Sequence, residues 1–164
     1  MNNLNYKLSN LIEKMITKNQ INEFLRPKEL AIAGVSRYPK KFGYHVFKEL
    51  KEKSFKVYPI NPNANKIDEE KCYSRVSELP DNISRLLILT PVYKVEETFQ
   101  EAIQKGIKNI WIQQKVLSQN IIKLAKENSV NLIWNKCIFM FAEPVKGPHA
   151  FHRWLLKIFG KLPK

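Results

Sequence analysis

The residues best suited to hold a phosphate lie close together in the segment 31–46, AIAGVSRYPKKFGYHV. After an apolar run it carries glycines, a hydroxyl and cations, namely Gly34, Ser36, Arg37, Lys41 and Gly43. Glycine lets a backbone approach an anion closely, and the start of a following helix offers unpaired N–H groups and a positive dipole end. This order of residue types predicts a diphosphate site at a strand-to-helix turn.

A second interpretation of the same glycines stays open. The spacing from Gly34 to Gly43 is longer than in G-x-G-x-x-G and includes Pro39, so the usual dinucleotide fingerprint is missing. Both glycines also suit a tight turn that packs a helix closely on a sheet, without any ligand.

The elements that must position this turn alternate between strands and helices. Short apolar runs predict five strands, at Leu30–Ala33, Phe55–Ile60, Leu86–Leu89, Asn109–Ile112 and Val130–Trp134. Apolar residues at helical spacing lie between them, at 42–50, 95–103 and 121–125. Helical crossovers require parallel strands, so we predict an α/β fold, a Rossmann-like doubly wound sheet of about five mainly parallel strands with helices on both faces.

The chain divides into three predicted parts. Residues 1–25 form an N-terminal helical segment, with helical spacing of leucines up to Met15 and a short helix over Asn19–Leu25. Residues 26–141 form the Rossmann-like domain, and residues 142–164 form a basic amphipathic helix packed on it. Within the domain, the polar stretch Asn63–Tyr73 is predicted to be a loop over the carboxyl edge of the sheet.

Charge and composition restrict the class of protein. The chain has 28 Lys and Arg against 15 Asp and Glu, a net charge of +13, which favours an anionic partner. No apolar run approaches the ~20 residues of a membrane helix, and the N-terminus lacks a signal-peptide pattern. Cys72 and Cys137 are too few for a disulfide framework. We therefore predict a cytoplasmic protein without a membrane span; a homodimer stays open.

The end of the second predicted strand narrows the choice of nucleotide. NAD binding favours an acidic residue there for the ribose diol, whereas this chain has VYPINPNANK and its first downstream carboxylate is Asp68. Asn61 and Lys66 suit a ribose that carries its own phosphate, as in coenzyme A (CoA) or NADP.

Longer stretches of the chain resemble the small stand-alone CoA-binding proteins, which are similar to the N-terminal CoA-binding domain of succinyl-CoA synthetase α subunits. The similar pieces lie within residues 27–140: LAIAGVSRYPKKFGYHVFKELKEKSFKVYPINPN, KCYSRVSELP, LLILTPVYKVEETFQEAIQKGIKNIWIQQ and NLIWNKCIFM. The resemblance implies that the ligand is CoA or an acyl-CoA, a small nucleotide-containing molecule.

The resemblance also implies a set of contact residues. They are the diphosphate loop Gly34, Val35, Ser36, Arg37, Lys41, Phe42 and Gly43, the second-strand end Asn61 and Pro62, the third-strand turn Thr90, Pro91 and Val92, and the fourth-strand end Ile112 and Gln113. The family often continues Trp-Ile-Gln-Pro-Gly at this last position, where this chain has Gln114-Lys115 in place of Pro-Gly.

No catalytic set emerges from the sequence, because no carboxylate pair, nucleophile–base set or metal cluster is recognisable. His149 and His152 are spaced for a shared metal but lack a third ligand. In the synthetases the phosphorylated histidine lies in a second domain, and we expect none after Met140. The chain is therefore predicted to bind CoA without catalysis. A narrower hypothesis is that Cys137, at the ligand edge, forms a mixed disulfide with the CoA thiol.

Two other functions fit parts of the sequence. One is an NADP-type nucleotide-binding oxidoreductase on the same fold. The other is a basic adaptor for an anionic membrane or nucleic acid, although no specific nucleic acid is predicted. The adaptor would use aromatic and basic residues of the last segment: Phe151, Arg153, Trp154, Lys157, Phe159 and Lys161.

Overall fold

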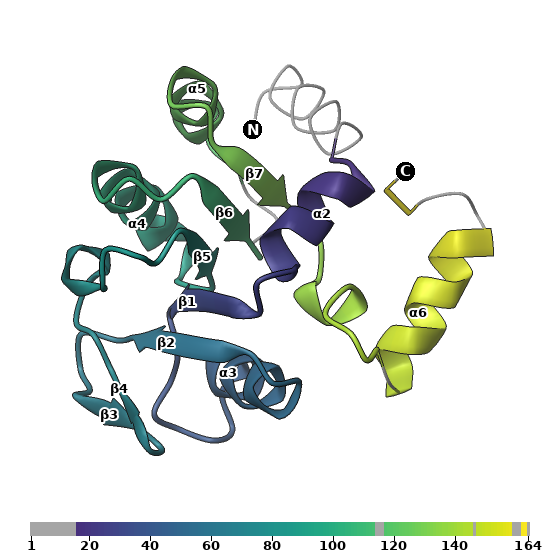
Figure 1. Ribbon diagram of the computed structural model, residues 1–164, viewed down its shortest axis with the longest axis horizontal. Helices are drawn as coiled ribbons and strands as arrows, with labels where there is room; N and C mark the ends of the chain where they lie inside the picture. Colours follow the sequence, from purple (N-terminus) through teal and green to yellow (C-terminus); the bar gives the residue numbers. More distant parts are fainter. Residues whose placement is uncertain (1–15, 114–116, 146, 159–161, 164) are drawn as a thin grey trace.

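The computed structural model describes residues 16–113, 117–145, 147–158 and 162–163 (Figure 1). The helix predicted from the leucines before residue 16 and the Gln114-Lys115 pair lie outside these residues. Within the described part of the chain, no helix combines the length and apolar character needed to cross a bilayer.

A five-stranded parallel sheet forms the centre of the molecule. Its strands are β1 Glu29–Ala33, β2 Lys56–Ile60, β5 Arg85–Ile88, β6 Asn109–Ile112 and β7 Asn131–Trp134. They lie in the order β2-β1-β5-β6-β7, and every neighbouring pair is parallel. The predicted Rossmann-like α/β fold is therefore confirmed. The chain leaves β1 toward β2 on one side and returns to β5 on the other, so its direction across the sheet reverses at β1.

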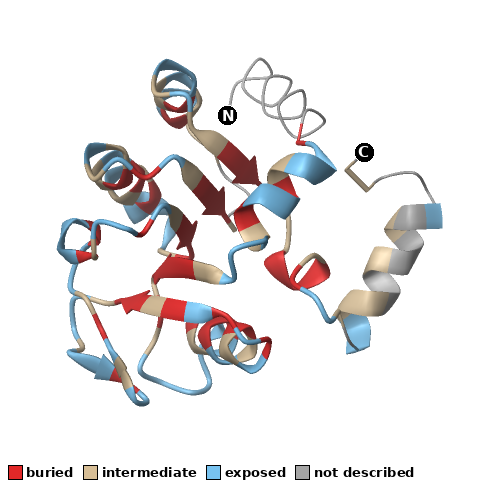
Figure 2. Ribbon diagram, in the orientation of Figure 1, coloured by how far each residue is buried: buried red, intermediate tan, exposed pale blue. Residues whose placement is uncertain are grey.

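Helices cover both faces of the sheet, which explains why its strands are almost continuously apolar. They are α2 Lys18–Leu25, α3 Phe42–Glu52, α4 Val92–Gln104 and α5 Gln119–Glu127. Side chains of α2 and α3 share one buried cluster with Leu30 and Ile32, whereas those of α4 and α5 share another with Ala31 and Ala33. Alternate residues of β1 thus point to opposite faces. Figure 2 shows the strands buried along most of their length.

The amphipathic spacing of α3 and α4, which flank the turn after β1, determines which side of each helix packs on the sheet. In α3, Val46, Phe47 and Leu50 are fully buried, and burial of such side chains contributes roughly 1.5–3 kcal/mol each. In α4, Phe99 is fully buried against the opposite face, and the helix is followed by Gly106, whose φ of +82° is typical of a left-handed helix terminator.

The prediction of a plain loop over Asn63–Tyr73 was wrong. The segment contains a small antiparallel hairpin, β3 Lys66–Ile67 and β4 Glu70–Lys71. Its turn docks on α3, because the Tyr44 hydroxyl donates to both carboxylate oxygens of Asp68, at 2.9 and 3.2 Å. The hairpin is positioned by this tertiary hydrogen bond together with burial of one apolar side chain, Ile67, in the core cluster that contains α3.

The C-terminal region begins with the 3₁₀ turn η2, Ile138–Met140, and continues into α6, Gly147–Ile158. The rings of Phe139 and His149 lie 5.0 Å apart, and Arg153 forms an ion pair with Glu143. A helix is therefore present where one was predicted. Figure 1 shows α6 beyond the edge of the sheet, and its packing on the domain as a whole stays a prediction.

Candidate functional site

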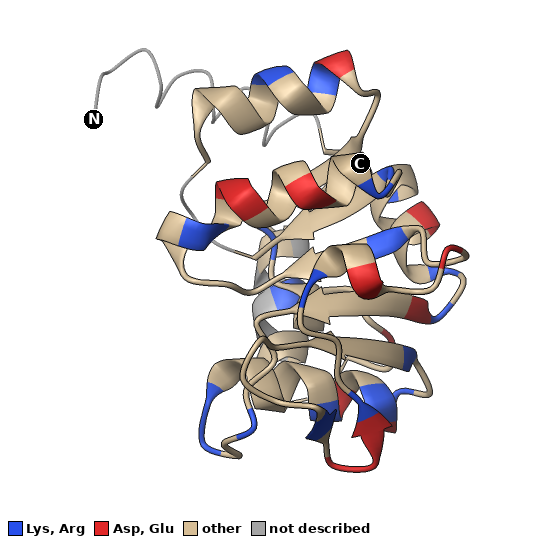
Figure 3. Ribbon diagram, turned by 90° about the vertical axis from the view of Figure 1, so that its left-hand side faces the viewer, with Lys and Arg blue, Asp and Glu red and all other residues tan. Residues whose placement is uncertain are grey.

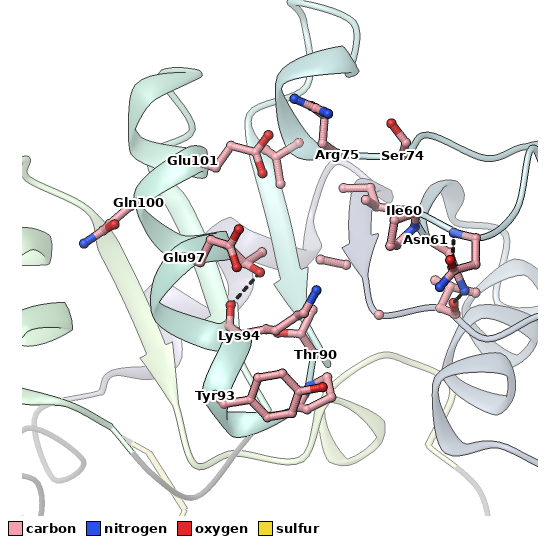
Figure 4. Close-up of a pocket in the computed structure, with 18 of the residues that line it drawn as sticks. Ile60, Asn61, Ser74, Arg75, Thr90, Tyr93, Lys94, Glu97, Gln100 and Glu101 are labelled. Atoms are coloured by element: carbon pink, nitrogen blue, oxygen red, sulfur yellow. Dashed lines mark hydrogen bonds between the residues drawn. The ribbon is translucent and has the colours of Figure 1, made fainter.

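A cleft of about 780 Å³ opens at the carboxyl edge of the sheet, beyond the ends of the neighbouring strands β1 and β5, where the direction of the chain across the sheet reverses. Its walls are the turn between β1 and α3, the end of β2, the segment that leads into the 3₁₀ turn η1, Val76–Glu78, and one side of α4 (Figure 4). The volume falls within the range of pockets that hold small molecules and cofactors, roughly 300–1,000 Å³.

The turn after β1 requires glycine at two positions. Gly34 has φ +91°, and a Cβ there would lie 2.8 Å from Leu89 C and from Thr90 N. A Cβ on Gly43 would lie 2.2 Å from Gly34 O, so the first turn of α3 rests directly on the turn. The interpretation of both glycines as turn and packing residues is confirmed. Their role in phosphate binding stays a prediction, compatible with this close approach.

Two of the helices that start at this edge, α3 and α4, are open to an anion. Neither α3, with N-cap Lys41, nor α4, with N-cap Pro91, has a side-chain cap or an acidic residue in its first turn. By contrast, Thr17 caps α2 and Ser118 caps α5. Figure 3 shows Lys and Arg where α4 begins and where the loop before α3 projects. Uncapped N–H groups and nearby cations together favour negative charge.

Asn61 connects the end of β2 to both sides of the cleft. Its Nδ2 donates to Val35 O at 2.7 Å, and its Oδ1 accepts from Asn63 N at 2.8 Å. Its backbone N donates to Tyr73 O at 2.9 Å. Ser36 Oγ accepts a hydrogen bond from Tyr38 N at 3.0 Å, so the hydroxyl proton of Ser36 is available to a ligand oxygen. The amide of Asn61 is thus a structural link within the site.

The structure brings one group of the predicted contact residues together as cleft lining: Gly34, Val35, Ser36, Asn61, Pro62, Thr90 and Pro91. They come from the ends of β1, β2 and β5. The resemblance in sequence and the geometry therefore converge on these strand ends.

Other predicted residues lie in the loop before α3 or at the starts of α3 and α4 rather than in the lining. Arg37 donates through Nη1 to Asn63 O at 3.2 Å, so its guanidinium is held beside the end of β2. Lys41, Phe42 and Gly43 open α3, and Phe42 is 50% exposed. Val92, the first residue of α4, is similarly exposed.

The remaining predicted residues are engaged elsewhere. Ile112 is fully buried in the core, and Gln113 Oε1 accepts from Ile138 N at 3.2 Å. Lys66, expected near the ribose, pairs with Glu69 at 2.7 Å on the hairpin and does not line the cleft. Cys137 is half-buried before η2 and is also outside the lining, so its mixed disulfide stays a hypothesis.

Several lining residues were missed by sequence reasoning. They are Ser74, Arg75 and Val76 before and in η1, and Tyr93, Lys94, Glu97, Thr98, Gln100, Glu101 and Gln104 on α4. A signal for the second set exists, because positions 94, 97, 101 and 104 are spaced by three or four and therefore share one face of a helix. The first set reaches the site through the bridge between Ile60 and Tyr73, which no local pattern encodes.

Hydrogen bonds fix the wall formed by η1. Ser74 donates through both its backbone N and its hydroxyl to Glu78, and these bonds lower the pKa of the Glu78 carboxyl. Glu101 Oε1 accepts from Ser77 N at 3.1 Å and from Ser77 Oγ at 3.0 Å, which joins η1 to α4. The wall is therefore ordered by its own polar contacts.

The profile of the CoA binding domain family matches residues 28–143. The chain belongs to the CoA-binding domain family. The matched residues run from just before β1 to just after η2, so the whole cleft lies within the family's domain, whereas α2 and α6 lie outside it.

Relatives of this CoA-binding domain include parts of larger enzymes. It is 32% identical to ADP-forming acetate–CoA ligase II of Archaeoglobus fulgidus, over 68% of this chain and 18% of the relative. It is 30% identical to the α subunit of the Pyrococcus furiosus enzyme, over 72% of this chain and 28% of the subunit. The chain thus spans less than a third of the length of these relatives.

A solved structure of similar size shares the fold. A hypothetical protein from Pyrococcus horikoshii OT3 is 30% identical, with a TM-score of 0.73, and the match covers 82% of this chain and 95% of that one.

Proposed function

We propose that the chain binds CoA or an acyl-CoA in the cleft at the carboxyl edge, and that it does so without catalysing a reaction. The observation that carries the proposal is the turn at Gly34, which lies beside two uncapped helix starts at the reversal point of a parallel sheet. Ligands of open α/β sheets bind at this place. Membership of the CoA-binding domain family supports the identity of the ligand.

In this proposal, each end of the nucleotide has its own contacts. The diphosphate lies against the backbone of Gly34–Ser36 and the starts of α3 and α4. Arg37 and Lys41 contribute positive charge there. The ribose lies at Asn61 and Pro62, with its phosphate toward Arg37, and the turn Thr90-Pro91 packs against the nucleotide.

The chemistry of the lining supports a binding role. Among the described residues, neither a histidine nor a cysteine lines the cleft, and no cluster of His, Cys, Asp or Glu is arranged to hold a metal ion. The polar lining side chains are hydroxyls, amides, carboxylates and two cations, Arg75 and Lys94, without a paired nucleophile and base. The cytoplasmic location and a homodimer stay predictions alongside this one.

Titration calorimetry with CoA and with NADPH in parallel tests the proposal. The double variant Arg37→Glu, Lys41→Glu removes two cations and adds two anions near the phosphates. A charge-assisted phosphate contact contributes roughly 1.5–3 kcal/mol, so CoA affinity should fall by more than about tenfold. The matched double reversal Lys123→Glu, Lys126→Glu on α5, away from the cleft, should bind as wild type does.

Two results would contradict the assignment. Tighter binding of NADPH than of CoA would favour the oxidoreductase. Unchanged CoA affinity in the Arg37, Lys41 double variant would mean that the phosphates bind elsewhere.

A further inference from the structure

One carboxylate on the α4 wall of the cleft is not used by the fold. Glu96 accepts hydrogen bonds from Ser118 Oγ at 2.7 Å and Asn120 Nδ2 at 2.6 Å, and Glu101 is held by η1. Glu97 lines the cleft, and within the described part of the chain no hydrogen bond or ion pair engages its carboxylate. An exposed acceptor without a structural role is available to a ligand.

This wall differs in charge from the Gly34 end of the same cleft. Figure 4 shows Glu97 and Glu101 on α4 on one side and Arg75 on the other, with Lys94 nearer the start of the helix. A phosphate placed beside two carboxylates would be repelled, whereas the uncapped helix starts attract it. The portion of the ligand that reaches Glu97 is therefore uncharged and donates hydrogen bonds.

The floor and the opposite wall favour a flat ring at this place. Ile60 and Val76 line the cleft and are buried, so they offer an apolar surface. Arg75 Nε lies 3.6 Å from a Glu78 oxygen, and its side chain is 67% exposed. A planar guanidinium in this setting is free to stack on an aromatic face.

We infer that this wall selects adenine, with Glu97 accepting a hydrogen bond from the 6-amino group while the base lies over Ile60 and Val76 and under Arg75. The assignment rests on the proposed function, because the diphosphate at Gly34 determines which end of the nucleotide reaches α4. Hypoxanthine and guanine carry a carbonyl oxygen at position 6, an acceptor that would face the carboxylate. The chain should therefore discriminate against them.

Calorimetric titration with CoA and with its deaminated analogue, in which hypoxanthine replaces adenine, tests this inference. Wild type should bind CoA at least about tenfold more tightly than the analogue, because a charge-assisted hydrogen bond is lost and two acceptors face each other. In Glu97→Gln the ratio should fall toward one, since the amide presents either its oxygen or its NH₂ group. Glu127→Gln, on the exposed side of α5, should keep the wild-type ratio.

The outcomes separate the two claims. Equal affinity of wild type for CoA and the analogue, or an unchanged ratio in Glu97→Gln, would overturn the selection of adenine and leave CoA binding intact. Failure of folded wild-type protein to bind CoA would overturn both.

Discussion

The two edges of the central sheet differ in how many of their polar groups find a partner within the protein. At the carboxyl edge, α3 and α4 begin without side-chain caps, and Glu97 has no partner among the described residues. Large apolar side chains are exposed on the same loops and helix starts: Tyr38, Phe42, Val92 and Tyr93. These helix starts, this carboxylate and these apolar side chains are therefore available for contact with a ligand.

The amino edge is closed by its own side chains. Lys53, at the end of α3, is only 8% exposed, and its Nζ donates to Ala142 O at 2.8 Å and to Glu49 Oε1 at 2.9 Å. Arg85, at the start of β5, donates through Nε and Nη2 to Glu23 O at 3.2 Å. The Lys53 bonds join α3 to the C-terminal region, and the Arg85 bonds join α2 to the sheet. The comparison indicates that one edge stabilises the fold while the other keeps its binding capacity.

The largest expected effect is at the open edge, with Gly43→Ala. The added methyl group would overlap Gly34 O, so the turn after β1 must move away from α3. We expect a loss of about 3 kcal/mol in the free energy of unfolding and a fall of more than about tenfold in CoA affinity. Gly106→Ala is the control: its Cβ meets open space, so only the positive φ costs about 1 kcal/mol and binding is kept. Unimpaired CoA binding by Gly43→Ala would argue against the turn as the phosphate site.

A smaller effect, at the closed edge, is expected for Lys53→Met. The variant leaves Ala142 O unpaired near the core, so the free energy of unfolding in urea should fall by about 2 kcal/mol. CoA affinity of the folded protein should not change, because the cleft lies at the other edge. Lys48→Met, five residues earlier and paired with Asp68 at 3.8 Å on the surface, should cost less than about 0.5 kcal/mol. A loss of CoA affinity in Lys53→Met would show that the two edges are coupled.

The smallest effect concerns the pH dependence of the closed edge. The Tyr58 hydroxyl donates to Glu29 Oε1 at 2.9 Å and, with Lys56, holds the pKa of the Glu29 carboxyl below its ordinary value of 4.5. A lowered folded-state pKa stabilises the fold above that ordinary value, and this contribution is lost as the pH falls through the folded pKa. Tyr58→Phe should therefore lose less stability than wild type between about pH 6.5 and about pH 4, by under about 1 kcal/mol.

Urea unfolding at the two pH values measures that difference. Tyr93→Phe, whose side chain is 80% exposed, provides the comparison and should follow wild type. Identical acid sensitivity of Tyr58→Phe and wild type would mean that this hydrogen bond does not contribute.

Local pattern was sufficient to predict most of the fold. Strand β6 was predicted at Asn109–Ile112, its observed bounds, because the apolar run is bounded by polar residues. The hairpin β3–β4 was missed, since two-residue strands rich in charge carry no periodic signal.

The sequence predicted residues on one side of the cleft lining and missed those on the other side. Gly34 and Asn61 stand out because glycine and amide residues follow apolar strands. In the sequence, Glu97 has the pattern of a solvent-exposed helix face. Only the pairing of Ile60 with Tyr73 brings Arg75 to the wall opposite Glu97, and no local pattern predicts that pairing. Ile112, assigned by resemblance alone, belongs to the core, because the last residue of an interior strand is covered by helices.

The hydrogen bonds of Asn61 have a consequence for affinity. One residue holds both Val35, at the proposed phosphate end, and Tyr73, beside the proposed base wall, so the fold itself sets the distance between these two proposed subsites. In the proposed binding mode, CoA enters a cleft whose two ends are already spaced by the fold, and little loop ordering opposes association. Fragments of CoA that occupy only one proposed subsite would bind to the same preformed cleft. Their separate affinities would therefore measure how much each half of the CoA molecule contributes to binding.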